Sequence, residues 1–167
     1  MFNSPDATTA ITRERSRDFA RGAKQREWNE KGIASVLADA SLFSQCSKRE
    51  LRLVAKLAKT KRIPAGENLT VENEPGDTMF VMLSGRATVH KSGRKIAALG
   101  MGDVVGELAA LSRGPRNATV TAVTDVEIAS VGRREILRLV EDAPGFSRKL
   151  LEAMANRIRE LDKKLVC

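Results

Sequence analysis

Glu107 and Arg116 are the residues of this sequence whose types and spacing best fit a chemical role. Glu107 follows a glycine and opens the apolar stretch 107–111, and Arg116 stands five residues after this stretch, at the start of a predicted strand. A short helix over 107–111 would present free backbone amides and the positive end of its dipole to an anion. Arginine offers a planar fork of donors that matches two phosphate oxygens. The pattern therefore favours a phosphate site.

Glu107 carries the wrong charge to bind a phosphate, but its carboxylate can accept a hydrogen bond from a sugar hydroxyl. A compact pocket that offers both a phosphate partner and a hydroxyl acceptor indicates a nucleotide ligand. The alternative is an ion pair between Glu107 and Arg116 that closes the fold and binds nothing. The spacing alone leaves both interpretations open.

The composition argues against the common catalytic and metal sites. The sequence has 167 residues, enough for one domain with its own core, and contains one histidine, His90, and two cysteines, Cys46 and Cys167. These counts exclude a poly-histidine metal centre, a four-ligand zinc site and a disulfide framework. No nucleophile–base pair and no pair of catalytic carboxylates stands out. We therefore expect no enzymatic activity, no metal and no cofactor.

The hydrophobic pattern contains no targeting or membrane signal. No apolar run reaches the roughly 20 residues that cross a bilayer, and the first residues lack the basic start and apolar middle of a secretory signal. We expect a soluble, cytoplasmic protein with reduced thiols.

The charged residues are distributed unevenly along the chain. The 29 basic and 21 acidic residues give a net charge of +8, which favours anionic partners. Residues 1–31 are interpreted as a charged arm, flexible or helical, and residues 32–167 as one folded domain. The run Lys48–Arg62 holds seven basic residues and one acidic residue. We interpret this run as a solvated helix face; a helix that binds nucleic acid is the alternative.

The segment around Glu107 and Arg116 has the periodicity of β-structure. Short apolar stretches alternate with glycine-containing turns, which predicts a small antiparallel barrel or jelly roll. The predicted strands are Leu69–Val71, Met79–Leu83, Ala87–Val89, Ile96–Leu99, Ala118–Val123 and Val126–Val131. The helical stretch 107–111 interrupts them, and an interruption of this kind indicates a site.

Helical patterns flank the β-segment on both sides. Ser47 and Glu50 form a capping box for a helix that we expect to end near Lys59. A short helix over Arg133–Glu141 and a longer one over Phe146–Val166 follow the last strand. The β-segment is thus expected to lie between two helical segments.

The last helix has the most regular apolar pattern in the sequence. Its seam residues, spaced alternately by three and four positions, are Leu151, Met154, Ile158, Leu161 and Leu165. This spacing is typical of a coiled coil. Because the opposite face is well charged, we favour pairing of this helix with a second copy of the chain over packing on its own domain.

The stretch from Gly106 to Ala118 resembles the phosphate-binding cassette of the cyclic-nucleotide-binding domain family, known from catabolite activator protein and the regulatory subunits of cyclic-AMP-dependent protein kinase. Gly106–Leu111 and Pro115–Ala118 match the cassette with the family's spacing. The likeness extends over about Phe43 to Leu161, through the turns at Pro75–Asp77 and Leu99–Asp103. It implies an α+β, mainly β fold: an antiparallel β-roll or jelly roll with N-terminal helices, a short cassette helix and C-terminal helices.

The resemblance implies a role for each matched cassette residue. Gly106 would allow the ligand to approach the backbone closely, and Glu107 would accept a hydrogen bond from the ribose 2′-hydroxyl. The amides of Leu108 and Ala109 would donate to the cyclic phosphate, and Arg116 would neutralise its charge. These residues form the expected ligand site, with no catalytic residue and no metal.

Asn117 takes the small-residue position next to the base. Members of the family that select cyclic GMP typically carry Thr or Ser at this position, and cyclic AMP sites usually carry Ala. Asn117 is neither, and we favour cyclic AMP over cyclic GMP as the ligand. Val105 replaces the phenylalanine that usually opens the cassette, which removes ring packing and no ligand contact.

The predicted function is that of a free-standing cyclic-nucleotide receptor. In the family the C-terminal helices close over the base as a lid, which implies that residues 145–166 form a lid and dimer helix here. Asn156, Arg157 and Glu160 are the polar lid candidates. The expected partners are the cyclic nucleotide and, through this helix, a second copy of the chain or another protein.

DNA is not an expected partner, because the chain ends at Cys167 and leaves no residues for a helix-turn-helix module. Two alternatives from other classes remain. One is a nucleic-acid-associated regulator that uses Lys48–Arg62. The other is a dimeric scaffold protein with a vestigial pocket.

Overall fold

The computed structural model describes residues 27–166, so most of the predicted arm lies outside the described residues, as does Cys167. The first described helix, α2 (Glu30–Asp39), begins inside the range assigned to the arm. Its N-cap is Asn29, whose side-chain oxygen accepts a hydrogen bond from the Gly32 amide at 2.8 Å. The helix therefore starts before the domain boundary expected at residue 32.

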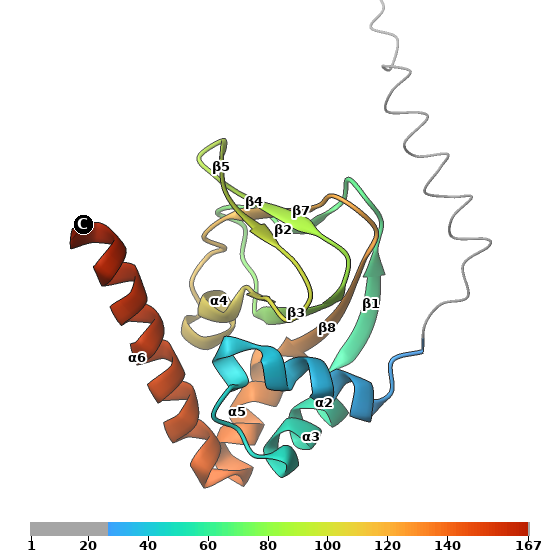
Figure 1. Ribbon diagram of the computed structural model, residues 1–167, viewed down its shortest axis with the longest axis vertical. Coiled ribbons are helices and arrows are strands. Elements are labelled where there is room, and N and C mark those ends of the chain that lie inside the picture. Colours follow the sequence, from blue (N-terminus) through green and yellow to red (C-terminus); the bar gives the residue numbers. More distant parts are fainter. Residues whose placement is uncertain (1–26, 167) are drawn as a thin grey trace, which may run out of the picture.

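Two four-stranded antiparallel sheets form the body of the domain (Figure 1). The strands are β1 (Lys59–Ile63), β2 (Asn68–Thr70), β3 (Thr78–Ser84), β4 (Ala87–Lys91), β5 (Arg94–Leu99), β6 (Val104–Val105), β7 (Thr119–Ala122) and β8 (Val126–Gly132). Their order is β1-β8-β3-β6 in one sheet and β2-β7-β4-β5 in the other. The predicted antiparallel β-roll is confirmed.

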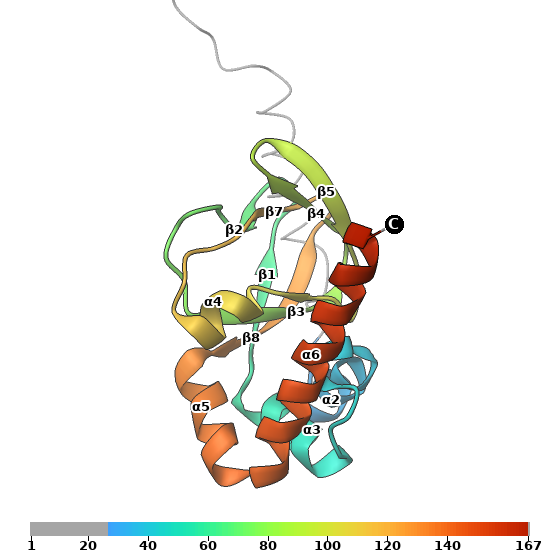
Figure 2. The ribbon, with the colours of Figure 1, turned by 90° about the vertical axis from the view of Figure 1, so that its left-hand side faces the viewer.

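Most helices gather at one end of the roll, and the last helix runs from that end along the side of the roll, as both ribbon views show (Figures 1 and 2). Besides α2 the helices are the 3-10 turn η1 (Ser41–Phe43), α3 (Lys48–Leu57), α4 (Glu107–Ser112), α5 (Arg133–Asp142) and α6 (Pro144–Val166). In α3 the Ser47 hydroxyl accepts from the Glu50 amide at 3.2 Å, so the predicted cap is present.

Alternation along β3 builds two cores. Met79, Val81 and Leu83 point to the helices and join their cluster, in which the rings of Phe43 and Phe146 stack with centroids 6.4 Å apart. The intervening residue Met82 points into the second core, which lies between the two sheets. The helical layer is therefore fixed to one face of the β1-β8-β3-β6 sheet.

The basic run Lys48–Arg62 is not one helix. Helix α3 ends at Leu57, and β1 begins at Lys59 and pairs with β8. Within β1 the Arg62 guanidinium forms an ion pair with Asp125 at 2.6 Å. The interpretation of the whole run as a helix face is wrong for its last residues, Lys59–Arg62, because they form β1 and pair with β8.

Helix α6 packs through its first half and is exposed along its second half. Phe146, Leu150 and Ala153 are buried in the helical core. Of the seam residues, Leu151, Ile158 and Leu165 are 70%, 58% and 83% exposed. Within residues 27–166, no helix combines the length and apolarity needed to cross a membrane.

Candidate functional site

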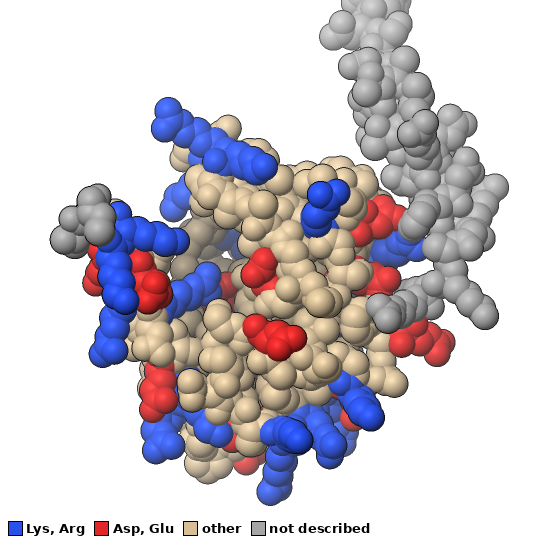
Figure 3. Space-filling model, in the orientation of Figure 1, with Lys and Arg blue, Asp and Glu red and all other residues tan. Residues whose placement is uncertain are grey.

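A cavity of about 510 Å³ lies between α4, the roll and the second half of α6. Figure 3 shows the surface hollowed between α6 and the body of the domain. The lining includes all six residues predicted from the sequence, namely Gly106, Glu107, Leu108, Ala109, Arg116 and Asn117. The volume is in the range that holds a small-molecule ligand.

Arg116 forms one polar wall of the cavity and is held by backbone carbonyls. Its side chain extends from the segment that leads into β7, and the residue is only 8% exposed. Nη1 donates to the Thr78 carbonyl at 2.7 Å and to the Gly106 carbonyl at 3.3 Å. The Phe80 ring lies under the guanidinium, with its centroid 5.5 Å from Cζ. These contacts fix the guanidinium beside α4.

Two glycines make room for this side chain. A Cβ atom at Gly76 would lie 2.5 Å from Arg116 Cζ, and one at Gly106 would overlap Nη1. Gly106 also has a φ of +79°, a conformation that glycine adopts readily and that most residues avoid. Glycine at both positions is therefore a condition for the observed placement of Arg116.

The Arg116 charge is buried without a close counter-ion. Burial lowers the pKa of Arg116 and the charge of Asp77 acts in the opposite direction; the guanidinium still remains protonated. Within residues 27–166, no carboxylate lies within ion-pair distance of it. A buried cation is stable only when its charge is compensated. The wall at Arg116 is thus suited to an anion.

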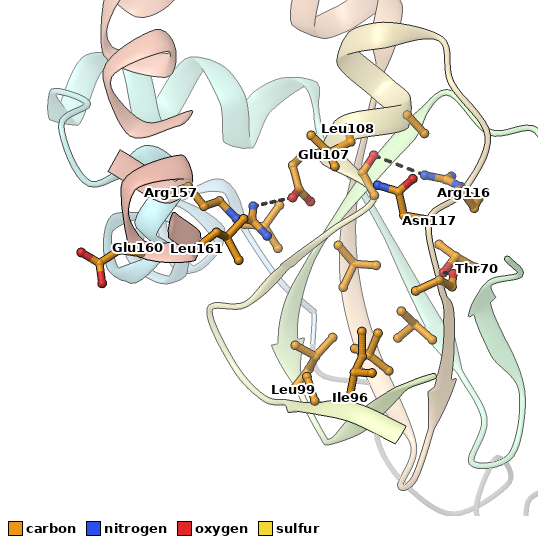
Figure 4. A pocket seen from close by; sticks show the side chains of 18 of the residues that line it. Thr70, Ile96, Leu99, Glu107, Leu108, Arg116, Asn117, Arg157, Glu160 and Leu161 are labelled. Atoms are coloured by element: carbon orange, nitrogen blue, oxygen red, sulfur yellow. Dashed lines mark hydrogen bonds and ion pairs between the residues drawn. The ribbon is translucent and has the colours of Figure 1, made fainter. Parts of the chain in front are cut away.

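Glu107 forms a second polar corner of the cavity. It is the first residue of α4, is 5% exposed, and forms an ion pair with Arg157 of α6 (Figure 4). The alternative in which Glu107 pairs with Arg116 is wrong, since Arg116 bonds to carbonyls instead. The carboxylate faces the cavity, where it can accept a hydrogen bond.

The start of α4 adds free donors. The first amide of the helix with a backbone acceptor is that of Ala110, which donates to the Gly106 carbonyl at 3.2 Å. The amides of Leu108 and Ala109 precede it and have no carbonyl within the helix to bond. They lie on the same cavity as Arg116. Arginine and amides together present several N–H donors to one region.

The remaining wall is apolar and comes mainly from the roll. Its members include Val89, Ile96, Leu99, Val105 and Val120. They were not predicted as site residues, because alternation identifies the two faces of a strand but not which face lines a cavity. Such a wall suits a flat, weakly polar group such as a nucleobase.

Two of the three polar lid candidates line the cavity. Arg157 and Glu160 line it, together with Leu161 and Lys164 of the same predicted lid helix, which were not among the named candidates, whereas Asn156 is not part of the lining. These four recur at helical spacing of three, one and three positions and so share one face of α6.

Two further features of the described residues concern metal binding and thiol reactivity. Within residues 27–166, no three His, Cys, Asp or Glu side chains gather in a way that would hold a metal. Burial, with Glu50 acting in the same direction and Lys149 opposing it, raises the pKa of Cys46 to about 11. This thiol is therefore a weak nucleophile at neutral pH.

Comparisons with known proteins relate the chain to one family. The profile of the cyclic nucleotide-binding domain family matches residues 60–143, which include the cassette. A CRP-like cAMP-activated global transcriptional regulator of Mycobacterium tuberculosis is 28% identical over 135 residues, covering 78% of this chain and 60% of the relative. The chain thus spans about 60% of the length of that relative.

Solved structures show the same fold. The N-terminal domain of a Streptomyces coelicolor transcriptional regulator is 28% identical, with a TM-score of 0.68 over 77% of this chain and 95% of that one. The regulatory domain of Toxoplasma gondii PKA, co-crystallised with cAMP, is 30% identical, with a TM-score of 0.64 over 72% of this chain and 48% of that one. Taken with the cassette and its cavity, these matches establish that the chain belongs to the cyclic nucleotide-binding domain family.

Proposed function

We propose that this protein is a receptor for cyclic AMP, bound in the cavity between α4, the roll and α6. The observation that carries the proposal is the buried Arg116 guanidinium, which has no carboxylate partner among the described residues. The ring phosphate of a cyclic nucleotide is a monoanion and supplies the missing charge. A charge-assisted hydrogen bond of this kind contributes about 1.5–3 kcal/mol.

The other cassette groups fit the rest of the nucleotide. The amides of Leu108 and Ala109 donate to the phosphate oxygens, and Glu107 accepts from the ribose 2′-hydroxyl. Gly106 lets the phosphate approach the backbone. The base lies against the apolar wall of the roll, with Asn117 at its edge.

The preference for cyclic AMP over cyclic GMP is supported by the relatives. The Mycobacterium relative is described as cAMP-activated, and the Toxoplasma domain was crystallised with cAMP. The apolar wall offers few polar groups to read the extra amino and carbonyl groups of guanine. An adenine ring therefore loses less hydration on entry than a guanine ring.

Ligand binding changes the position of α6 in this proposal. Arg157 of α6 pairs with Glu107, the carboxylate that the ribose hydroxyl needs. A bound ribose competes for that carboxylate, so it alters the contact that holds α6 next to α4. The C-terminal helix then closes on the base or moves its outer face toward a partner.

A second copy of the chain is the proposed protein partner. Leu151, Ile158 and Leu165 are 70%, 58% and 83% exposed and lie along one seam of α6. Pairing two such seams would bury them as a short coiled coil. Sedimentation of the wild type and of Ile158→Glu tests this: a dimer that becomes monomeric in the variant is expected, and a monomeric wild type contradicts self-pairing.

Titration calorimetry with cyclic AMP, cyclic GMP and 5′-AMP tests the ligand assignment. We expect cyclic AMP to bind most tightly, and Arg116→Ala to weaken its binding at least about tenfold without unfolding the domain. Arg113→Ala is the matched control, because Arg113 is exposed on the same loop and does not line the cavity. Equal or tighter binding of 5′-AMP, or unchanged affinity in Arg116→Ala, would contradict the proposal.

A further inference from the structure

Arg133 connects the cassette helix to the C-terminal helices. It is the first residue of α5, and its Nη1 donates to the carbonyls of Ala110 and Leu111 at 2.9 and 2.6 Å. These carbonyls belong to the last turn of α4, where no amide of the same helix is left to bond them. The cation also meets the negative end of the helix dipole. Arg133 thus anchors the C-terminal end of α4.

Arg133 and Arg116 hold opposite ends of α4 against neighbouring carbonyls of one segment. The Arg133 amide donates to the Asp77 carbonyl at 2.8 Å, and the Arg116 guanidinium donates to the Thr78 carbonyl at 2.7 Å. Arg116 also reaches the carbonyl of Gly106, which caps the first turn of α4. The start of β3 is therefore a common support for both arginines.

The two anchors differ in strength. Arg116 bonds the start of α4 through one long contact of 3.3 Å, from a guanidinium that lines the cavity. Arg133 bonds the end of α4 twice, and Ala110, one of the two acceptor residues, is fully buried in the helical core. A ligand that drew Arg116 toward itself would weaken the contact at the first turn of α4, while the last turn would keep both bonds to Arg133. Helix α4 would then turn about its C-terminal end.

A rotation of α4 about its C-terminal end would be transmitted to α6 through α5. Arg133 begins α5, and a single residue, Ala143, separates α5 from α6. The Nε atom of Arg133 is buried without an acceptor in this conformation. An unpaired buried donor costs free energy, so a change in the angle between α4 and α5 that gives it a partner is favoured.

We propose that Arg133 is a positioning residue that transmits the orientation of α4 to α5 and α6, although it does not line the cavity. The inference rests on the proposed cyclic-nucleotide function and specifies how that site is connected to the C-terminal helix. It predicts that ligand affinity and the response of α6 can be separated by substitution at residue 133.

Amide hydrogen exchange on the full chain, with and without saturating cyclic AMP, tests this separation. In Arg133→Gln we expect affinity within about threefold of wild type, and loss of at least about half of the ligand-dependent change in exchange across α5 and α6. Arg133→Lys retains a cation without the fork, so part of the response should return. Arg134→Gln is the matched control, since Arg134 is the exposed neighbour on α5.

The outcomes distinguish this inference from the function on which it rests. A full α5–α6 response in Arg133→Gln overturns the role of Arg133 and leaves the receptor function intact. A wild type that binds cyclic AMP but changes exchange only around the cavity does the same. A wild type that binds no cyclic nucleotide overturns both. If Arg133→Gln does not fold, Arg133→Lys is tested by the same measurements of cyclic AMP affinity and amide exchange. A full ligand-dependent change in exchange across α5 and α6 in that variant would again overturn the role of Arg133.

Discussion

Glu107 and Arg157 form an ion pair that joins the first residue of α4 to the second half of α6 across the mouth of the cavity. Glu107 is nearly buried, whereas the Arg157 side chain is 44% exposed. The carboxylate that we assign to the ribose hydroxyl is therefore also the partner of Arg157. In the proposed receptor, ligand binding and the position of α6 depend on the same carboxylate, which would make their energies interdependent.

Replacing Arg157 with alanine is expected to tighten cyclic AMP binding by about two- to fivefold. A half-exposed ion pair contributes about 0–1 kcal/mol, and the ligand no longer spends that amount in displacing it. Hydrogen exchange of α6 without ligand should become faster in the same variant. Calorimetry on Arg157→Ala and on the control Arg159→Ala, on the exposed side of α6, provides the measurement. Binding weakened about tenfold in Arg157→Ala would instead mean that Arg157 contacts the ligand directly.

The space around Arg116 predicts a large effect of a single methyl group. In Gly76→Ala the new Cβ would lie 2.5 Å from Arg116 Cζ, so the guanidinium must leave its place. We expect cyclic AMP affinity to fall at least about tenfold, as in removal of a charged hydrogen-bond partner, with a small change in Tm. Gly100→Ala is the matched control, because a Cβ there meets no atom within 4 Å. Similar affinities in the two variants would show that Arg116 does not need the space left by Gly76.

Glu107→Gln tests the ribose contact. The amide keeps the shape of the carboxylate but accepts a hydrogen bond less strongly and no longer pairs with Arg157. We expect the wild type to prefer cyclic AMP over its 2′-deoxy analogue and the variant to lose most of this preference. Calorimetry with both nucleotides measures it. If the substitution weakens both nucleotides by the same factor, Glu107 does not contact the 2′-hydroxyl.

The cassette could be predicted from the sequence because its residues lie within a short stretch of chain. Helix α4 spans Glu107–Ser112, against 107–111 expected, and its residues and Arg116 line the same cavity. The residues that hold the Arg116 guanidinium in place could not be predicted in the same way. Gly76 and Thr78 lie about 40 residues earlier, and only the pairing of distant strands brings them to the guanidinium.

Periodicity predicted which residues of α6 share a face, but not what each face contacts. The seam and the lid share Leu161 and otherwise lie on adjacent faces of the helix, and Asn156 falls outside both. The interpretation of Lys48–Arg62 as one helix face was wrong for a related reason. The charges of this run fit a helix as well as an edge strand, and the choice is made by the backbone bonds between β1 and β8.

Acid should weaken the fold partly through Glu50, which pairs with Lys149 at 2.8 Å and links α3 to α6. Burial opposes ionisation of Glu50, but the Lys149 contact and the Ser47 amide group outweigh it and lower its pKa below the ordinary 4.5. The folded state therefore keeps the carboxylate charged where the unfolded chain already binds a proton. The stabilisation is complete above about pH 4.5 and is lost as pH falls through the lower folded pKa.

Glu50→Gln should remove that contribution at neutral pH and flatten the acid part of the stability curve. The expected loss is about 1–3 kcal/mol, because Lys149 is left largely buried without its partner. The free energy of unfolding should still fall with pH in this variant, because the pKa of Asp125 is also lowered. At Asp125, burial opposes ionisation, but the Ala65 amide and Arg62 outweigh it. Urea unfolding of the wild type, Glu50→Gln and the exposed control Glu141→Gln between pH 3 and 7 measures the difference. An unchanged acid slope in Glu50→Gln would show that the Glu50–Lys149 pair contributes nothing to acid unfolding.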